Sequence, residues 1–406
     1  MRGMTSAMTI GERVAWYRRR RGLSQEVLAG LVGRTVDWLS KVENNRIELD
    51  RLSVIKAMAD ALDIALGDLL AEPSLLEWTS ETGHRTVSAL RDALLDYRQI
   101  TMFGRSVGAV EPPTIDQLTR QVCELWDAYQ ASRFGYVTAR LPELLTQAQA
   151  AVEVGPSTME PHRLLGLTYQ LAATQLTKIG EADLAWIAAE RGLATARQTE
   201  DIAVIGSLTR SVVHALQSAG KYREAVRLTE DAAGMFASSL RTADGEILSI
   251  YGTLLLAGSM AAARADDRTA TRSFIAEAYS AGRRLGRDGN HLWTAFGPTN
   301  VAVHRVATAA ELGDIQFAVG LGPRIDTSAM PMERRVRHAL EVARAYSRWN
   351  RNEEAQATLL DAEQMAPEQV RYHFLGRQLV TGWLRRGRAK PTPTLLALAK
   401  RMNMLQ

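Results

Sequence analysis

Cysteine is nearly absent from this chain, and long apolar runs are scarce. The single cysteine, Cys123, excludes an internal disulfide and is consistent with a reducing cytoplasm. The N-terminal segment has no apolar core of a secretory signal, and no stretch reads as long and apolar enough to cross a bilayer. We therefore expect a cytoplasmic protein that has no membrane partner.

The motifs of common enzymes and metal sites are also missing. The sequence has no GxxxxGK[ST] phosphate loop, no HExxH, no GxSxG and no Cys/His spacing suited to zinc. The glycine-rich turn at residues 320–323 lacks a preceding strand, and the seven histidines are scattered. We expect no cofactor, no metal and no enzyme activity, since catalysis would need a constellation that the sequence does not reveal.

Positive charge is concentrated at the amino end. The net charge is +4 over 406 residues, and residues 1–51 hold ten Lys and Arg against six Asp and Glu. A local excess of cations is the footprint expected of phosphate binding. The length favours two or three domains, and the hydrophobic content of 46% supports well-packed cores.

Residues 23–46 show the clearest pattern, two short amphipathic helices joined by a tight turn at Gly33. Ser24 and Thr35 are residue types that cap helix N-termini, and each stands before one of the two helices. The predicted inward positions are Val27, Leu28, Leu31, Val32, Leu39 and Val42. Helices this short need flanking helices to complete a core, and residues 9–21, 52–62 and a short run ending at Leu70 supply them.

This segment resembles the lambda-repressor-like (Xre-type) helix-turn-helix over about residues 9–70. The resemblance rests on RRRRGLSQ at residues 18–25, Leu28-Ala29, Gly33, and LSKVE at residues 39–43. It implies a DNA-binding domain over residues 1–72, with double-stranded DNA as partner. The predicted DNA-binding residues are Arg18, Arg19, Arg21, Gln25, Arg34, Thr35, Val36, Asp37, Trp38, Ser40, Lys41, Asn45 and Arg46.

The second of the two helices would read base edges in the major groove. Val36 suits a thymine methyl, and Ser40 or Lys41 suits a base edge. Asp37 either accepts from a cytosine amino group or only supports the helix N-terminus. Trp38 either packs on the first helix or lies along the DNA backbone.

Phosphates would be contacted from the flanks of that helix. The arginines at residues 18–21 either bind phosphates or form a solvated charge run. Gln25 either donates to a phosphate or only caps its helix. Asn45 stands at a position suited to a left-handed residue, and Arg46 is an expected backbone anchor.

A connector over residues 73–113 follows, with one amphipathic helix marked by Val87, Leu90, Leu94 and Tyr97 and then a loop from Gly104. This helix either makes a dimer contact or packs on the next domain. From residue 114 the pattern changes to paired amphipathic helices with almost no strand signal. The predicted fold class is thus all-α.

A helix-turn-helix pattern recurs near residues 179, 219, 264, 312 and 350, with a degenerate copy from Glu124. The small residues that would let paired helices approach are Ala185, Ala225, Ala270, Ala318 and Ala355. The pattern resembles the tetratricopeptide repeat. It implies a helical solenoid over residues 114–390 and a capping helix over residues 391–406.

The concave face of such a solenoid is a natural groove for an extended peptide or a small ligand. Carrying over the repeat's concave positions gives Gln170, Lys178, Arg210, His214, Gln217, Asn300, Arg337 and Arg344, with Thr174, Val303 and Arg348 beside them. Side-chain amides can hydrogen-bond the unpaired backbone groups of an extended peptide, and arginines can bind a carboxylate. The alternative for each is a polar, solvated groove, and His304 is expected to be a packing residue.

The combination of the two parts resembles the peptide-pheromone-responsive regulators of the Rgg/PlcR kind. It implies a transcription regulator that reads DNA as a homodimer and senses a signalling peptide or small ligand. A tetratricopeptide scaffold whose helix-turn-helix binds protein is the alternative, and a repeat-regulated enzyme is a further one that the missing motifs disfavour.

Overall fold

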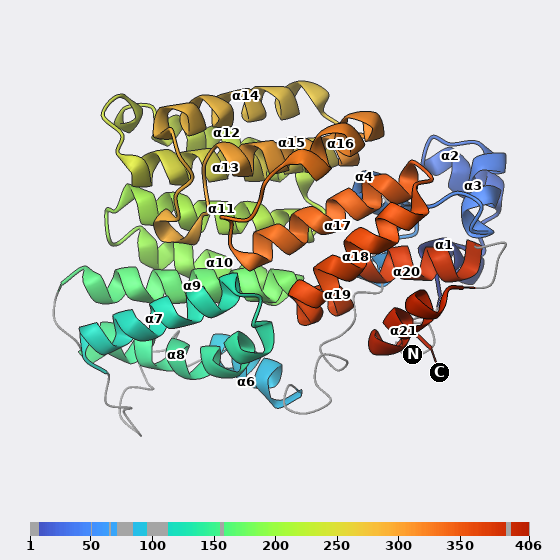
Figure 1. Ribbon diagram of the computed structural model, residues 1–406. Coiled ribbons are helices and arrows are strands. Elements are labelled where there is room, and N and C mark those ends of the chain that lie inside the picture. Colours follow the sequence, from blue (N-terminus) through green and yellow to red (C-terminus); the bar gives the residue numbers. More distant parts are fainter. Residues whose placement is uncertain are drawn as a thin grey trace.

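The computed structural model describes residues 8–49, 51–64, 66–70, 84–95, 113–154, 158–386 and 391–405. Throughout these residues the regular structure is helical, which confirms the all-α class. The chain begins with a small helical domain, and a larger stack of antiparallel helices follows it (Figure 1).

The small domain consists of α1 (Ile10–Arg20), α2 (Gln25–Leu31), α3 (Val36–Glu43), α4 (Leu52–Ala61) and α5 (Leu66–Leu70). The predicted caps are confirmed, because the Ser24 hydroxyl accepts from the Val27 amide and that of Thr35 from the Trp38 amide. Gly33 in the turn has a φ of 63°, in the left-handed region. The sequence alone therefore specifies where α2 and α3 begin.

The core of this domain is formed by all five helices. Its fully buried side chains include Val14, Leu28, Leu39, Ile55 and Met58. The prediction was wrong for two inward positions, because Val27 is 49% and Leu31 is 61% exposed. Helix α2 has only two turns, and the face that carries Leu28 and Ala29 is the one in contact with the core.

The larger part begins with α6 (His84–Leu94), which packs against α8 (Phe134–Val154) and α10 (Ala182–Ala196). Leu90 and Leu94 are fully buried in the core of this larger part, so the connector helix packs on the next domain. The Val87 side chain, Tyr97 and residues 104–112 lie outside the described residues. The helices that follow are α7 (Ile115–Gln130), α8 (Phe134–Val154), α9 (Glu160–Lys178), α10 (Ala182–Ala196), α11 (Ile202–Ser218), α12 (Tyr222–Met235), α13 (Gly245–Arg264), α14 (Arg268–Leu285), α15 (Pro298–Leu312), α16 (Ile315–Leu321), α17 (Met332–Arg348) and α18 (Asn352–Met365).

Three short 3-10 segments, η3 (Ser239–Arg241), η4 (His291–Trp293) and η5 (Gly322–Arg324), interrupt this series. The chain closes with α19 (Pro367–Tyr372), α20 (Phe374–Arg386) and α21 (Pro393–Arg401). Successive pairs such as α9 with α10 and α13 with α14 pack extensively against each other, and α11 packs on both α9 and α13. Pairs that contact mainly their neighbours make a solenoid.

Each predicted helix-helix turn is confirmed, and each contains one residue whose backbone is in the left-handed region. These residues are Gly180, Gly220, Asp266, Gly313 and Asn350, and Ser132 plays the same part in the degenerate copy. Five residues after each lies a buried residue, which is alanine in four cases, Thr271 after Asp266 and Val137 after Ser132. The prediction of Ala270 was therefore wrong by one position, since Ala270 is half-buried and Thr271 is 4% exposed.

One helix corrects the expectation about membranes. By length and composition, α13 could cross a bilayer, but 83% of its apolar window is buried inside the protein. It contacts α11, α12, α14 and α15. Its apolar character therefore suits the core helix of a solenoid.

The small domain is docked on the solenoid. The Arg51 guanidinium pairs with Asp266 at 2.7 Å, and the Leu49 carbonyl accepts from the Gln378 amide at 2.7 Å. Tyr222 joins the buried cluster of the small domain, with Phe374 packed beside it. Helices α1 and α4 lie toward the solenoid while α2 and α3 lie on the outside (Figure 1).

Candidate nucleic-acid interface and ligand cavity

Helix α3 presents a polar face to solvent on the outer side of the small domain. Val36 is 43% exposed, and the side chains of Asp37 and Lys41 are 73% and 44% exposed. Arg34, Thr35 and Arg46 are exposed at its two ends, and Ser40 is half-buried. Because α2 and α3 point away from the solenoid, this face is open to a large partner (Figure 1).

Two local interactions order this face. Lys41 pairs with Asp37 at 2.7 Å, one turn apart on α3. The Arg34 guanidinium lies over the Trp38 ring at 5.4 Å, and Trp38 is packed against the domain core. An ion pair this exposed contributes little to stability, so Asp37 and Lys41 can exchange it for other partners.

Arg18 does not belong to this face, and its predicted phosphate contact is wrong. Its guanidinium is buried and donates to both Glu43 oxygens, from Nε at 2.6 Å and Nη2 at 2.8 Å. The Gln25 amide, predicted to donate to a phosphate, donates to the same carboxylate at 2.7 Å. These hydrogen bonds hold the pKa of Glu43 below its usual value, although burial raises it. The cluster joins α1, α2 and α3.

Asn45 is left-handed as predicted, with a φ of 58°. Its side chain accepts from the Thr9 hydroxyl and donates to Glu12 at 3.3 Å, which favours a structural role. Arg21 donates to Asp63 at 2.8 Å, and Arg19 is exposed. Of the arginines in residues 18–21, Arg18 is thus structural and the other three reach solvent.

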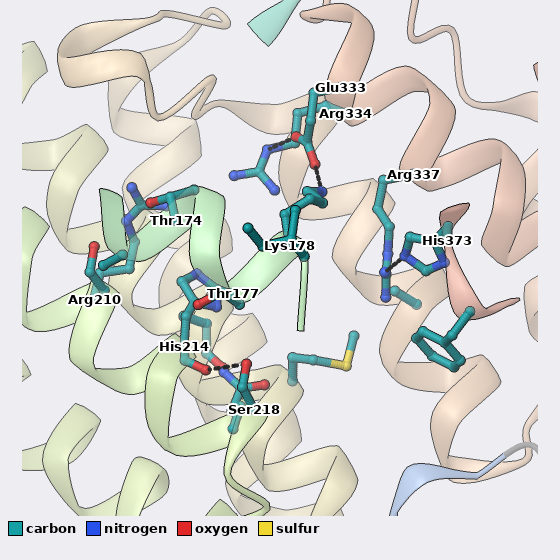
Figure 2. A pocket seen from close by; sticks show the side chains of 18 of the residues that line it. Thr174, Thr177, Lys178, Arg210, His214, Ser218, Glu333, Arg334, Arg337 and His373 are labelled. Atoms are coloured by element: carbon teal, nitrogen blue, oxygen red, sulfur yellow. Dashed lines mark hydrogen bonds and ion pairs between the residues drawn. The ribbon is translucent and has the colours of Figure 1, made fainter. Parts of the chain in front are cut away.

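A second feature is a cavity of about 270 Å³ inside the solenoid (Figure 2). Its walls come from α7, α9, α11, α13, α15 and α17, from η4, and from the segment between α19 and α20. Leu52 of α4 and Leu66 and Leu70 of α5 also line it, so the small domain forms part of the wall. The cavity therefore lies where the two parts of the chain meet.

Five of the eight predicted ligand residues line this cavity, namely Lys178, Arg210, His214, Gln217 and Arg337. Thr174, Val303 and His304 lie there too. The prediction was wrong for the other three. The Gln170 amide donates to the Ser207 hydroxyl at 2.6 Å, that of Asn300 donates to the Ala295 carbonyl at 2.9 Å, and Arg344 pairs with Glu311 and Glu341.

Those three residues point between neighbouring helices. Their side chains are 0%, 1% and 3% exposed, and none lines the cavity. Arg348 also lies elsewhere, donating to the Ala310 carbonyl at 2.9 Å. On a helix, a residue on the concave face and a residue in the contact between helices are only one or two positions apart. Alignment of the repeats alone does not tell these positions apart.

Several lining residues were missed, chiefly Arg264, Glu333, Arg334 and His373. Lys178 pairs with Glu333, and Arg337 contacts His373 (Figure 2). Arg337 also donates to Glu341 at 2.8 Å. Arg337 lies one turn after Glu333 on α17, so the spacing could have identified Glu333 and Arg334 as neighbours of a predicted site residue. Nothing in the sequence indicated that His373 or the small domain would line the cavity.

The cavity holds neutral histidines among fixed cations. Burial, followed by the charges of Arg210 and Arg334, lowers the pKa of His214 well below its usual value. Burial and Arg334 lower the pKa of His304 to about 4, and burial and Arg337 lower that of His373 strongly. Among the described residues no group of His, Cys, Asp and Glu is arranged to hold a metal ion.

Comparison with known proteins agrees for the small domain. Residues 9–72 match the family model described as a helix-turn-helix domain. No curated protein matches the sequence. Among the solved structures that match, three similar ones have low identity.

The first is a Rap protein complexed with Competence and Sporulation Factor, at 12% identity and TM-score 0.49, covering 90% of this chain and 99% of that one. Aspartyl phosphate phosphatase F from Bacillus subtilis follows at 14% identity and TM-score 0.44, covering 94% and 97%. Bacillus thuringiensis PlcR in complex with the peptide PapR7 and DNA has 11% identity and TM-score 0.30, covering 68% and 95%.

Because these TM-scores are all below 0.5, we assign the solenoid from the repeated turns of this chain and not from the three structures. Residues 9–72 are a helix-turn-helix domain, and the helices that follow form a tetratricopeptide-like solenoid.

Proposed function

We propose that this protein is a cytoplasmic transcription regulator that binds double-stranded DNA through α3. The observation that carries the proposal is the exposed polar face of α3, which the docked solenoid leaves open on the outer side of the molecule. An α-helix of this kind fits the major groove. Arg34 and Arg46, exposed at its two ends, are placed to neutralise phosphates while Val36 and Ser40 meet base edges.

One such domain makes few contacts, and tight specific binding generally requires two. We therefore include a homodimer that reads two half-sites roughly 34 Å apart, or a multiple of that distance. The solenoid is the part that remains to pair the two copies, since α2 and α3 face the DNA.

The solenoid binds a peptide or small ligand in its cavity and thereby regulates DNA binding. Because Leu52, Leu66 and Leu70 line the cavity, a ligand there touches the DNA-binding domain directly. A ligand shifts a conformational equilibrium only by its difference in affinity for two states. A ligand that contacts both the small domain and the solenoid binds the docked and undocked states with different affinity, so its binding shifts the equilibrium between them.

Selection of bound fragments from the protein's own genome, followed by titration of the best fragment at several salt concentrations, tests the DNA-binding role. We expect log K to fall linearly with log salt, with a slope near −0.9 for each phosphate neutralised. Arg46→Ala should weaken binding on all sequences and reduce the slope by about one phosphate. Ser40→Ala should change which sequence is preferred. Arg272→Ala, on the exposed side of α14, is the matched control and should leave binding unchanged.

A protein-binding scaffold is the second candidate, because Val27 and Leu31 form an exposed apolar pair on α2. Protein partners favour such surfaces more than the DNA backbone does. No binding to any fragment at low salt, with full retention of fold, would overturn the DNA-binding role in favour of this one.

A further inference from the structure

The cavity carries a net positive charge that the protein itself does not neutralise. Five cationic side chains line it, and two carboxylates, Glu333 and Glu341, face them. Lys178 pairs with Glu333 and Arg337 with Glu341. Arg264 donates to the neutral Gln217 amide oxygen at 2.8 Å, and the Nε of Arg334 is 3.6 Å from Glu333, already paired. The remaining cation is Arg210.

Arg210 is the unusual member of the set. It lies on α11 and is only 6% exposed, and its Nε is a buried donor without an acceptor. Within the described part of the chain it makes no hydrogen bond or ion pair. Burial and the nearby charge of Arg334 lower its pKa to about 10. Keeping an unpaired guanidinium buried is costly, so an anion beside it would be strongly favoured.

Apolar and aromatic side chains also line the cavity. The Trp126 and Trp293 rings stack with centroids 5.3 Å apart and planes at 10°. Both line the cavity, as do Met260 and Val303. Cationic and apolar side chains that line one space fit an amphipathic molecule with an anionic head.

We propose that the cavity binds a molecule through a carboxylate or phosphate group held by Arg210 and Arg334, with an apolar part against Trp126 and Trp293. This inference rests on the proposed ligand-binding role of the solenoid and names the chemical class of its ligand. The guanidinium fork suits both anions, since it donates two parallel hydrogen bonds to either. The free carboxylate of a peptide and a small organic acid or phosphate are the two sources of this chemistry.

The size of the cavity limits what is enclosed. About 270 Å³ is at the lower end of ligand pockets, so it encloses a small acid or the last residues of a peptide. Lys178 and Arg337 are already paired, and Arg210 and Arg334 lie on different helices, α11 and α17. An anion bound by both would bridge two repeats of the solenoid; both arginines are labelled in Figure 2.

Thermal unfolding and calorimetry of the full-length protein test the inference, with phenyl phosphate as the first probe. Phenol is its uncharged counterpart. A second pair is N-acetyl-phenylalanyl-leucine with a free carboxylate and the same dipeptide amidated. We expect saturable protection by phenyl phosphate or by the free dipeptide, whichever source is right, and none by the two uncharged counterparts.

The Arg210→Gln variant separates a binding role from a structural one. It should bind the effective probe about tenfold to a hundredfold more weakly, because a hydrogen bond to a charged group is lost. Without probe it should melt at the same or a higher temperature, because an unpaired buried charge has been removed. Arg283→Gln, exposed on α14, is the matched control and should behave as the unaltered protein in both respects.

Three results would overturn the inference: protection that survives Arg210→Gln, a lower melting temperature for that variant, or equal binding of charged and uncharged probes. Equal binding of the free and amidated dipeptides would keep a peptide-binding solenoid and remove the anion. DNA binding is measured separately, so its failure is distinguishable from any of these.

Discussion

Glu311 offers the sharpest test of how the DNA-binding domain is held. It lies on α15, is 2% exposed, and accepts from the backbone amide of Leu52 at 2.7 Å. Leu52 is the first residue of α4, whose N-cap Arg51 makes no side-chain capping bond. A carboxylate from the solenoid therefore caps a helix of the DNA-binding domain, and this contact also complements the helix dipole.

The change to make is Glu311→Ala. Loss of a helix cap costs about 1 kcal/mol, and removing one partner of a buried ion pair costs about 3–5 kcal/mol. Arg344 keeps Glu341 at 2.7 Å, which lowers the second cost. We expect the docking of α4 to weaken by about 2–4 kcal/mol, because the cap is lost in full while Arg344 still has Glu341 as a partner.

Hydrogen exchange of the α4 amides measures this loss directly. Each 1.4 kcal/mol corresponds to a tenfold faster exchange, so α4 should exchange roughly 30- to 1000-fold faster in the variant. Glu353→Ala, exposed at the start of α18, is the control and should leave α4 unchanged. Unaltered exchange in α4 with Glu311→Ala would show that the other docking contacts hold the domain without this cap, and would refute the reasoning.

Three further predictions concern stability. Gly11→Ala should destabilise the DNA-binding domain by about 1–3 kcal/mol, because a Cβ there would lie 2.1 Å from the Val42 carbonyl oxygen and force α1 from α3; urea unfolding followed by Trp16 and Trp38 fluorescence measures it. Glu43→Gln should cost about 3–5 kcal/mol in the same assay, since it leaves the buried Arg18 without its carboxylate, and a cost near zero would contradict this. The lowered pKa values of His214, His304 and His373 mean that the unfolded chain binds more protons below pH 6.5. Stability should therefore be greatest above pH 6.5 and fall as the pH drops below it, by up to about 1.4 kcal/mol per pH unit for each histidine, and His373→Gln should reduce the slope of melting temperature against pH.

Local features were predictable from the sequence because their causes are local. Ser24 and Thr35 cap the helices they precede, and Gly180 or Asn350 turns the chain wherever a left-handed residue is needed. The single error of register, Ala270 for Thr271, arose where two small residues are adjacent and Asp266 replaces the usual glycine. Helix boundaries and turns thus followed from composition and spacing.

The candidate site was predicted only in part, because it depends on how helices rotate and dock. Gln170 and Thr174 are one turn apart on α9, yet the first donates to Ser207 between helices and the second lines the cavity. Leu52, Leu66 and Leu70 are buried in the core cluster of the first domain. Nothing local indicates that their other side closes a cavity formed by residues more than fifty positions away.

A chain of polar contacts joins that cavity to the DNA-binding domain. Arg337, which lines the cavity, donates to Glu341; Glu341 pairs with Arg344, and Arg344 pairs with Glu311 at 3.2 Å. Glu311 in turn caps α4 at Leu52. Substitutions within one such network are not additive, since each partner sets the charge that its neighbour faces. The cost of Glu311→Ala should therefore differ when Arg337 has also been replaced, and a double-mutant cycle between the two measures how strongly the cavity and the DNA-binding domain are coupled.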